Sequence, residues 1–234
     1  MIQIAIIGAS GRMGQELLAL AHEHGFEVSG GVGRSATPGA NFKLVDHVSK
    51  LDPKKTKLVI DFSLPELTPD VLSWCANEKV PLVSGVTGLT AELKSQLAKA
   101  AQSTPILWAP NMSLGVAVLS RMLNELKHLH GFEFQIEELH HSRKKDKPSG
   151  TALFLQEKME AAIGEKAPEP LAIRGGGIFG IHRVWAMGEE ETITLEHNAM
   201  NRRVFARGAM KAAQWLITQK PALYTINDML GHEA

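Results

Sequence analysis

The sequence predicts an α/β protein in which a parallel N-terminal sheet is followed by a second, α+β domain with a mixed or antiparallel sheet. In the first half, short apolar runs alternate with helical patterns, beginning with Ile2–Ile7. After Asn111, segments such as 132–140 instead alternate apolar and polar residues, which is typical of half-buried strands. Short strands interleaved with helices are typical of a parallel sheet covered on both faces. The change of pattern near residue 111 therefore predicts two domains.

Each element follows from its local pattern. Short apolar runs predict strands over Ile2–Ile7, Phe26–Val32, 57–62, 81–84 and 105–109. Helical spacing predicts helices over 15–24, 69–78, 91–102, 114–128 and 205–219, and a loop rich in Gly, Pro and Ser occupies 34–40. Alternation predicts strands over 132–140, 180–187 and 191–197. The tight charged turn at 188–190 predicts that the last two strands form an antiparallel hairpin.

Composition and charge exclude several classes of protein. The chain has 234 residues, of which 44% are hydrophobic and 21% charged, as in ordinary soluble globular proteins. Its 25 basic residues balance 25 acidic ones, which argues against a broad nucleic-acid footprint or an electrostatic membrane anchor. The single cysteine, Cys75, excludes an intramolecular disulfide and a cysteine-based zinc site. No apolar run reaches the roughly 18 residues that span a bilayer, and the N-terminus shows no signal-peptide pattern, so we expect a soluble cytoplasmic protein.

A glycine-rich turn follows the first strand. Gly8, Gly11 and Gly14 are spaced three residues apart between that strand and a helix. Gly8 permits a tight exit from the strand, Gly11 lets the backbone approach a pyrophosphate, and Gly14 lets the helix pack closely on the sheet. The helix N-terminus offers free N–H donors to phosphates. This pattern predicts dinucleotide binding; the alternative is a strand–helix turn that uses glycine only for geometry.

Three other loops follow strands of the same sheet. The acid that usually holds the ribose hydroxyls of NAD is absent after the second strand, where Gly33 and Arg34 stand instead. Arg34 therefore favours NADPH, whose 2′-phosphate a guanidinium can bind, unless Arg34 is only a solvated loop residue. Residues 85–88 and 109–111 follow two later strands, at the edge where ligands bind in open α/β sheets. Either segment could equally be an ordinary strand–helix turn.

The segment 140–151 concentrates the chemistry of the second half. His140 and His141, four cations including Lys144, and a Pro-Ser-Gly-Thr sequence that opens a helix fall within twelve residues. Ser149, Gly150 and Thr151 can offer N–H groups and hydroxyls to an anion at that helix start. We interpret the segment as a site that binds a carboxylate and donates a proton; a solvated basic loop is the alternative. A zinc site is not expected, because adjacent strand residues point to opposite faces.

A glycine loop and further cations lie later in the second half. Arg174 precedes three glycines, and the 196–202 segment ends in cations. Arg202 or Arg203 could clamp a carboxylate, although both features could equally be loop geometry and surface charge.

Taken together, these motifs resemble the dihydrodipicolinate reductase family, the 4-hydroxy-tetrahydrodipicolinate reductases of the diaminopimelate–lysine pathway. The resemblance runs over nearly the whole chain, and the His-Lys-PSGT block is highly specific. Its motifs are GASGRMG at 8–14, DFS at 61–63, GVTG at 85–88, APNMSLGV at 109–116, ELHHSRKKDKPSGTA at 138–152 and RGGG at 174–177.

The resemblance implies a fold, an assembly and site residues. It implies a Rossmann-like dinucleotide-binding domain (1–111) completed by a C-terminal helix (205–234), a substrate-binding and oligomerisation domain (112–204), and a homotetramer formed through the second sheet. By resemblance, His140 is a proton donor or acceptor, Lys144 is the proton donor, and His141 contacts substrate. Substrate contacts are also expected at Ser149, Gly150, Thr151 and Arg202. The expected cofactor contacts are Gly8, Ala9, Ser10, Gly11, Arg12, Met13, Arg34, Gly85, Val86, Thr87, Ala109, Pro110, Asn111 and Met112.

The resemblance also implies a reaction: 4-hydroxy-tetrahydrodipicolinate loses water, and NADPH or NADH reduces the resulting cyclic, imine-containing dicarboxylate to tetrahydrodipicolinate. The chain departs from the family pattern at Val86, Gly33 and Asn201, and the first two bear on the choice between the cofactors. Another NAD(P)-dependent reductase of the same layout remains an alternative, as does a non-catalytic dinucleotide-binding redox sensor. A sensor would need neither Lys144 nor the Pro-Ser-Gly-Thr turn.

Overall fold

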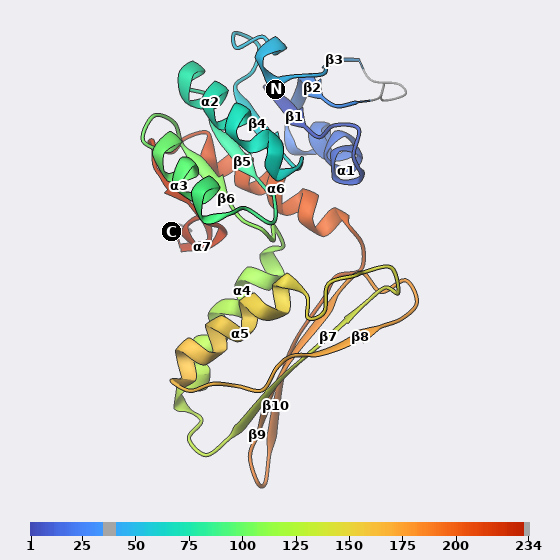
Figure 1. The fold of residues 1–234 in the computed structure, drawn as a ribbon, viewed down its shortest axis with the longest axis vertical. Coiled ribbons are helices and arrows are strands. Elements are labelled where there is room, and N and C mark those ends of the chain that lie inside the picture. The colour runs from blue at the N-terminus through green and yellow to red at the C-terminus, as the bar shows by residue number, and fades with distance from the viewer. Residues whose placement is uncertain (35–40, 232–234) are drawn as a thin grey trace. The chain divides into compact units, whose positions relative to one another are not determined.

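The computed structural model describes residues 1–34 and 41–231 and divides the chain into two compact units (Figure 1). One unit comprises Met1–Met112 and Phe205–Ala234, and the other comprises Ser113–Val204. Of the loop expected at 34–40, residues 35–40 lie outside the described residues, as do residues 232–234.

A seven-stranded sheet forms the centre of the first unit. Its order is β11-β6-β5-β4-β1-β2-β3, and every pairing within it is parallel, which confirms the predicted parallel sheet. The strands are β1 (Ile2–Ile7), β2 (Phe26–Val32), β3 (Lys43–Val45), β4 (Leu58–Asp61), β5 (Leu82–Ser84), β6 (Ile106–Trp108) and β11 (Leu223–Tyr224). From β1 the chain first adds strands on one side, β2 and β3, and then on the other, β4 to β6. The carboxyl end of β1 is therefore the point where the strand order reverses, which is where ligands bind in such sheets.

Helices cover both faces of this sheet. They are α1 (Arg12–Ala21), α2 (Thr68–Glu78), α3 (Ala91–Ala100), α6 (Arg203–Leu216) and α7 (Ile226–Gly231), with 3₁₀ turns η1 (His22–His24), η2 (Val48–Lys50) and η3 (Pro65–Leu67). Buried side chains of α2 and α3, such as Val71 and Leu97, pack in one core with Ala5 and Ile7 of β1. On α6, Arg207 pairs with Glu23 beside α1 at 2.7 Å.

Gly208 lets α6 lie very close to the main chain at Met112. It lies within α6, and a Cβ at this position would overlap the carbonyl oxygen of Met112. Since α6 also buries four alanines and one methionine, its small residues let it lie against the main chain that follows β6.

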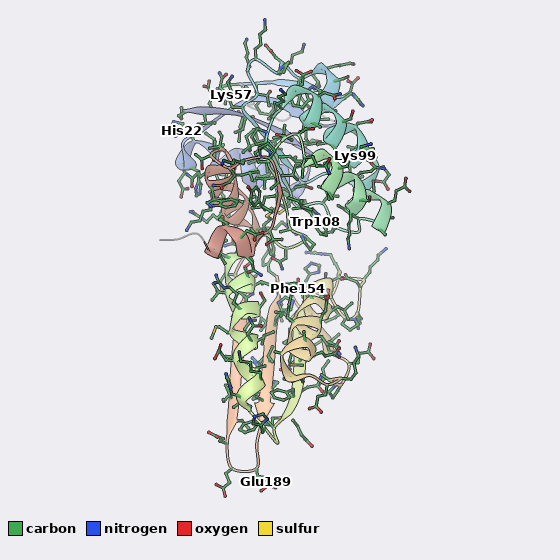
Figure 2. The ribbon with its side chains drawn as sticks, turned by 90° about the vertical axis from the view of Figure 1, so that its left-hand side faces the viewer. His22, Lys57, Lys99, Trp108, Phe154 and Glu189 are labelled. Atoms are coloured by element: carbon green, nitrogen blue, oxygen red, sulfur yellow. The ribbon has the colours of Figure 1, made fainter. Side chains whose placement is uncertain are left out.

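The second unit is built on a four-stranded sheet in the order β10-β9-β7-β8. Its strands are β7 (Glu133–His140), β8 (Leu171–Arg174), β9 (Ile181–Met187) and β10 (Thr192–Asn198). β7 pairs parallel with β8 and antiparallel with β9, and β9 pairs antiparallel with β10, which confirms the predicted mixed sheet. Glu189 lies at the tip of the β9–β10 hairpin (Figure 2).

Helices lie against one face of this sheet. α4 (Leu114–Met122), the 3₁₀ segment η4 (Leu123–His128) and α5 (Gly150–Ile163) pack there (Figure 1). Their core includes Leu123 and Leu155 from the helices and Ile136 and Val184 from the sheet. On the opposite face, which we call the outer sheet face, Leu171 and Ile173 of β8 are 57% and 45% exposed. The outer sheet face also carries Leu139, Ile181, Arg183 and Trp185 by alternation along β7 and β9.

The structure corrects two expected helices. The segment 114–128 is not one α-helix, because α4 ends at Met122 and η4 continues as 3₁₀ helix. Residues three apart eclipse in a 3₁₀ helix, so Leu123 and Leu126 both reach the core at 0% and 4% exposure. The C-terminal helix expected over 205–234 is also wrong as a single element: α6 ends at Leu216, and β11 and α7 follow. Pro221 cannot continue a helix, and the chain turns into the sheet instead.

Smaller differences concern element bounds and short strands. α1 begins at Arg12, directly after the glycine turn and three residues before the expected start. The sequence analysis missed β3, β8 and β11, which have two to four residues each. Within the described residues, no helix has both the length and the apolar character needed to cross a bilayer.

Candidate functional site

In the first unit, the glycine-rich turn between β1 and α1 is shaped by close backbone contacts. Gly8 has φ +80°, a left-handed conformation that favours glycine. A Cβ at Gly14 would overlap the carbonyl oxygens of Gly8 and Ala9, so only glycine lets α1 start this close to the turn. Gly11 is the N-cap of α1, and no side chain caps this terminus, which leaves first-turn N–H groups of Arg12 and Met13 available to an anion. The turn therefore fits the pyrophosphate of a dinucleotide.

The structure brings the other expected cofactor residues to the same edge of the sheet. Arg34 follows β2 and is exposed, Gly85 to Thr87 follow β5, and Ala109 to Met112 follow β6. Ser10 lies beside Gly33, where a Cβ would meet the hydroxyl oxygen of Ser10 at 2.7 Å. Val86 and Met112 are each 1% exposed. The main chain of Val86 is bonded within the protein, since its N–H donates to the Ser84 hydroxyl and its carbonyl accepts from the Trp108 ring.

Asp61 ends β4 on this edge and is a buried carboxyl group that the sequence analysis noted only as part of a motif. It is 1% exposed, and its Oδ1 accepts a hydrogen bond from the Ser63 amide at 2.9 Å. Burial raises the pKa of Asp61 to about 6, against the opposing effect of the hydrogen bonds from Ser63.

In the second unit, the carboxylate of Glu138 is the centre of a buried polar cluster. Glu138 lies on β7 with no exposed surface. Arg174 of β8 donates from Nη2 to Oε1 at 2.6 Å and from Nη1 to Oε2 at 2.9 Å. The amide of Ser149 donates to Oε1 at 3.1 Å, and Nδ1 of His140 lies 2.5 Å from Oε2. Burial alone would raise the pKa of Glu138, but the bonds from Arg174 and His140 outweigh it and hold the pKa below its usual range.

Three histidines line the same face of this sheet. The rings of His140 and His182 meet edge to face with centroids 5.1 Å apart, and the ring of His197 lies 6.4 Å from that of His182. His197 Nε2 lies 3.0 Å from the hydroxyl of Ser113, which caps α4. Burial lowers the pKa of all three histidines, to about 3 for His182, so all three are neutral at pH 7.

Lys144 and His141 lie in the segment that follows β7. The Nζ atom of Lys144 lies 2.9 Å from a carboxylate oxygen of Asp146, and the lysine side chain is 24% exposed. The amide of Lys144 donates to the carbonyl of His141, which holds a tight turn. The Nδ1 atom of His141 is buried without a hydrogen-bond partner among the described residues. Lys144 thus lies next to the Glu138 cluster, where its charge acts on His140.

The start of α5 differs in one respect from the expected anion-binding turn. Ser149 is the N-cap: its hydroxyl accepts from the Ala152 amide and lies 3.3 Å from His182 Nε2, while its own amide donates to Glu138. Ser149 therefore holds the turn together through bonds within the protein. Gly150 is exposed at the first helical position, with open space where a side chain would be, and Thr151 follows it.

Arg202 lies between β10 and α6. Its guanidinium stacks on the ring of Phe179, 5.5 Å from the centroid. In the part of the chain that the structure describes, no hydrogen bond or ion pair joins Arg202 to His140, Lys144 or Ser149. Nor does that part contain a group of three or more acidic, His or Cys side chains arranged to hold a metal ion.

The sequence analysis missed Glu138 and His182 as members of the site. Glu138 stands two residues before His140, so both side chains lie on the same face of a strand, and this spacing was the available signal. His182 could not be found in this way, because its neighbours come from other strands.

The chain is similar to known proteins over nearly its whole length. Family models described as dihydrodipicolinate reductase, N-terminus and C-terminus, match residues 2–112 and 115–230. The chain is 45% identical to a 4-hydroxy-tetrahydrodipicolinate reductase of Bdellovibrio bacteriovorus over 233 residues, which cover 98% of this chain and 96% of the relative. It is 40% identical to the enzyme of that name from Nitratiruptor sp., over 99% of this chain and all of the relative.

Solved structures share the fold. A dipicolinate-bound dihydrodipicolinate reductase from Paenisporosarcina sp. TG-14 matches with a TM-score of 0.83 and 20% identity, covering 96% of this chain and 97% of that one. An amine dehydrogenase from Mycobacterium smegmatis matches with a TM-score of 0.69 and 13% identity, covering 97% and 95% of the two chains. From the two family models and the near-full-length relatives, the chain belongs to the dihydrodipicolinate reductase family.

Proposed function

We propose that this protein is an NAD(P)H-dependent 4-hydroxy-tetrahydrodipicolinate reductase, which forms tetrahydrodipicolinate in lysine biosynthesis through diaminopimelate. The observation that carries the proposal is the buried Glu138–Arg174–His140 cluster beside Lys144 and the start of α5. The cluster combines groups that exchange protons with groups that bind anions. The chain is also 45% identical to a 4-hydroxy-tetrahydrodipicolinate reductase, which supports the same function.

The first unit would hold the cofactor, and NADPH or NADH supplies the hydride when bound. Main-chain N–H groups of Arg12 and Met13 at the N-terminus of α1 would bind the pyrophosphate, because no side chain caps this helix. The amides of Gly8, Ala9 and Gly11 donate to carbonyls within the protein and shape the turn. Arg34 would bind the 2′-phosphate of NADPH. Residues 85–87 and 109–112 would line the nicotinamide half, since they follow β5 and β6 at the same edge of the sheet.

The second unit would bind the substrate and supply the proton. Reduction of the cyclic imine leaves negative charge on the ring, and Lys144 is proposed to donate a proton there, with His140 as the second proton-exchanging group. Gly150 and Thr151 would bind one substrate carboxylate at the start of α5, with Ser149 holding the turn. His141 and Arg202 would contact the substrate elsewhere. Cations around the site offset the charge of a dicarboxylate.

Two alternatives are less well supported. A semialdehyde dehydrogenase that acylates a cysteine needs a reactive thiol, whereas Cys75 is buried within α2 and burial raises the pKa of its thiol. A non-catalytic redox sensor would have no use for a buried ion pair that holds a histidine beside a lysine.

A turnover assay separates these possibilities. The substrate is generated in situ from pyruvate and aspartate semialdehyde by the preceding synthase, and oxidation of NADPH or NADH is followed by absorbance. The proposed reductase consumes cofactor only when both the synthase and its substrates are present. Binding of cofactor without substrate-dependent oxidation would instead support the sensor.

We also propose a cytoplasmic homotetramer assembled through the outer sheet face. This face carries exposed Leu171 and Ile173 and is not covered by the helices of its own unit (Figure 1). Exposed apolar residues in a contiguous patch mark interaction surfaces, and the edges of an open sheet invite pairing. In this proposal residues 1–111 with the C-terminal segment bind the cofactor, and residues 112–204 bind the substrate and form the tetramer.

A further inference from the structure

Beyond the residues assigned above, we propose that Glu138 is a positioning residue: its carboxylate fixes neutral His140 as the tautomer that carries its proton on Nδ1 and leaves Nε2 free to exchange protons. This inference rests on the proposed function only where it states that Nε2 of His140 exchanges protons during the reaction. The tautomer itself follows from the hydrogen-bond network of Glu138 and can be measured without any activity.

The first step of the argument is the charge of Glu138. Both of its oxygens face groups that can only donate: the two terminal nitrogens of Arg174 and the amide of Ser149. A protonated carboxyl group could keep these bonds only by donating its O–H to Nδ1 of His140, and it would lose the charge that pairs with Arg174. A bidentate guanidinium also stabilises the ionised form strongly in a buried setting. Glu138 is therefore an anion whose lone pairs accept every hydrogen bond it makes.

The second step assigns the proton of His140. Its Nδ1 lies 2.5 Å from Oε2 of Glu138, within hydrogen-bonding distance. Since an ionised carboxylate has no hydrogen to give, Nδ1 must carry the proton. In the neutral ring, Nε2 then has the free lone pair. Gly180 leaves space on that side, because a Cβ there would come within 3.0 Å of Nε2.

The third step considers every charged or titratable group that acts on His140. Arg174 on β8 and Lys144 after β7 disfavour the charged imidazolium, as does burial, and the neighbouring His182 on β9 is neutral. Glu138 on β7 opposes these effects through its hydrogen bond and its charge. Glu138 therefore sets the tautomer of the neutral ring and also favours its protonation at Nε2.

The same carboxylate joins two parts of the proposed site. Oε2 binds the ring of His140, and Oε1 binds the amide of Ser149 at the N-cap of α5. One buried ion pair thus orients the proton-exchanging ring and the turn that begins α5. Its positive partner, Arg174, keeps this anion from repelling a carboxylate bound nearby.

Replacement of Glu138 by glutamine makes a sharp test, because it keeps the shape and changes one acceptor into a donor. At the Oε1 position an NH₂ group would face the donors of both Arg174 and Ser149, neither of which can change. At the Oε2 position it would face Nη1 of Arg174, which cannot change, and Nδ1 of His140, which can accept if the ring proton moves to Nε2. Glu138→Gln should therefore convert His140 to the Nε2–H tautomer.

The measurement is ¹⁵N NMR of the histidine rings, with the His140 signals identified by their loss in His140→Gln. We expect the Nδ1–H tautomer in the unmodified protein and the Nε2–H tautomer in Glu138→Gln. In the reductase assay, kcat should fall about 10²–10⁴-fold, as for loss of an acid–base group or its correct tautomer, with KM for NADPH unchanged. The pH profile of kcat/KM should lose the limb that reports His140.

Glu137→Gln is the matched control. Glu137 precedes Glu138 on β7, faces the outer sheet face and pairs with Arg183 at 2.8 Å, so this change removes a carboxylate from an ion pair on the same strand without touching His140. It should leave the His140 tautomer and the pH profile unchanged. An Nε2–H tautomer in the unmodified protein would overturn the inference even if Glu138→Gln does not fold. An unchanged tautomer in a folded Glu138→Gln protein would overturn it too. The expected tautomers without reductase activity would instead reject the proposed function and leave the role of Glu138 standing.

Discussion

Oε2 of Glu138 and Nδ1 of His140 lie 2.5 Å apart on the same face of β7, two residues from one another. Alternate residues of a strand share a face, so a rigid element holds both groups without help from a mobile loop. Arg174 on the neighbouring strand completes the arrangement by pairing with both oxygens of the carboxylate. The proton chemistry that we propose is thus built into the sheet, while Lys144 acts from the turn that follows it.

Replacement of Lys144 by methionine should lower kcat about 10²–10⁴-fold, because a general acid typically contributes that factor. Affinity for NADPH should not change, since the proposed cofactor residues lie in the first unit. Steady-state kinetics and fluorescence titration of NADPH measure the two quantities. Lys145→Met, which removes the neighbouring exposed lysine, is the control and should keep normal turnover. If Lys144→Met retains more than about a third of the turnover, Lys144 is not a general acid.

Replacement of Arg34 by alanine should weaken NADPH binding by about 1–3 kcal/mol, the size of a hydrogen bond to a charged group. NADH has no 2′-phosphate, so its affinity should change little. Calorimetric titration of both cofactors provides the comparison, with Lys43→Ala on β3 as a control for loss of an exposed cation. Equal losses for NADPH and NADH would mean that Arg34 does not recognise the 2′-phosphate.

Asp61 should make stability depend on pH. Its folded-state pKa is raised from 3.8 to about 6, so between these values the unfolded chain is ionised while the folded protein remains protonated. Stability contributed by this group is therefore fully present below pH 3.8 and lost as the pH rises through 6. The difference in pKa corresponds to about 3 kcal/mol.

Asp61→Asn removes this buried charge. Its advantage in free energy of unfolding over the unmodified protein should grow from near zero at pH 4 towards about 3 kcal/mol above pH 6. Urea denaturation across this pH range measures it. Glu66→Gln, at an exposed carboxylate in η3, is the control for loss of an acidic side chain from the surface. A pH-independent difference for Asp61→Asn would show that Asp61 titrates normally.

Gly208→Ala should destabilise the first unit, although alanine is normally the better helix former by about 1 kcal/mol. The added Cβ would overlap the carbonyl of Met112, and such overpacking typically costs about 1–3 kcal/mol. We expect a lower Tm by calorimetry. Gly231→Ala in α7, where the added Cβ meets no atom, should not lower it. A Tm at or above that of the unmodified protein would show that α6 moves away from Met112 at little cost.

Ile173→Glu should break the proposed tetramer into smaller species, since it places a charge in the outer sheet face at a residue that is 45% exposed. Light scattering at micromolar concentration measures the mass. Leu153→Glu, on α5 at 49% exposure, introduces the same charge away from that face and should leave the mass unchanged. A stable monomer of the unmodified protein would rule out the tetramer.

Much of the fold could be predicted from the sequence, because the patterns that indicate each helix and strand are local. β1 and β2 match their predicted bounds. A short apolar run that ends at a glycine or a charged residue indicates where a strand begins and ends. The short strands β3, β8 and β11 were missed because their pairing depends on distant neighbours, not on their own patterns. The break between α4 and η4 was missed for a similar reason: tertiary packing of Leu123 and Leu126 decides it.

For the site, the sequence indicated candidate residues such as His140 and Lys144 but not Glu138, His182 or the partners of each group. The glycine turn and the 140–151 segment could be recognised from composition and spacing. That Ser149 uses its amide on Glu138, and that Arg174 pairs with that same carboxylate across 36 positions, depends on the parallel pairing of β7 with β8. The partners of a buried charged side chain can be identified only once the tertiary structure shows which groups surround it.

Hydride transfer to the cyclic dicarboxylate is the central claim, and an isotope measurement tests it most directly. NADPH deuterated at the transferred position of C4 is supplied with substrate generated in situ, and the product is analysed by mass spectrometry. We predict one deuterium in each tetrahydrodipicolinate formed, in step with cofactor oxidation, and no product from Lys144→Met on the same timescale. Cofactor oxidation without deuterium in the product, or no oxidation at all, would contradict the assignment of this protein as the reductase.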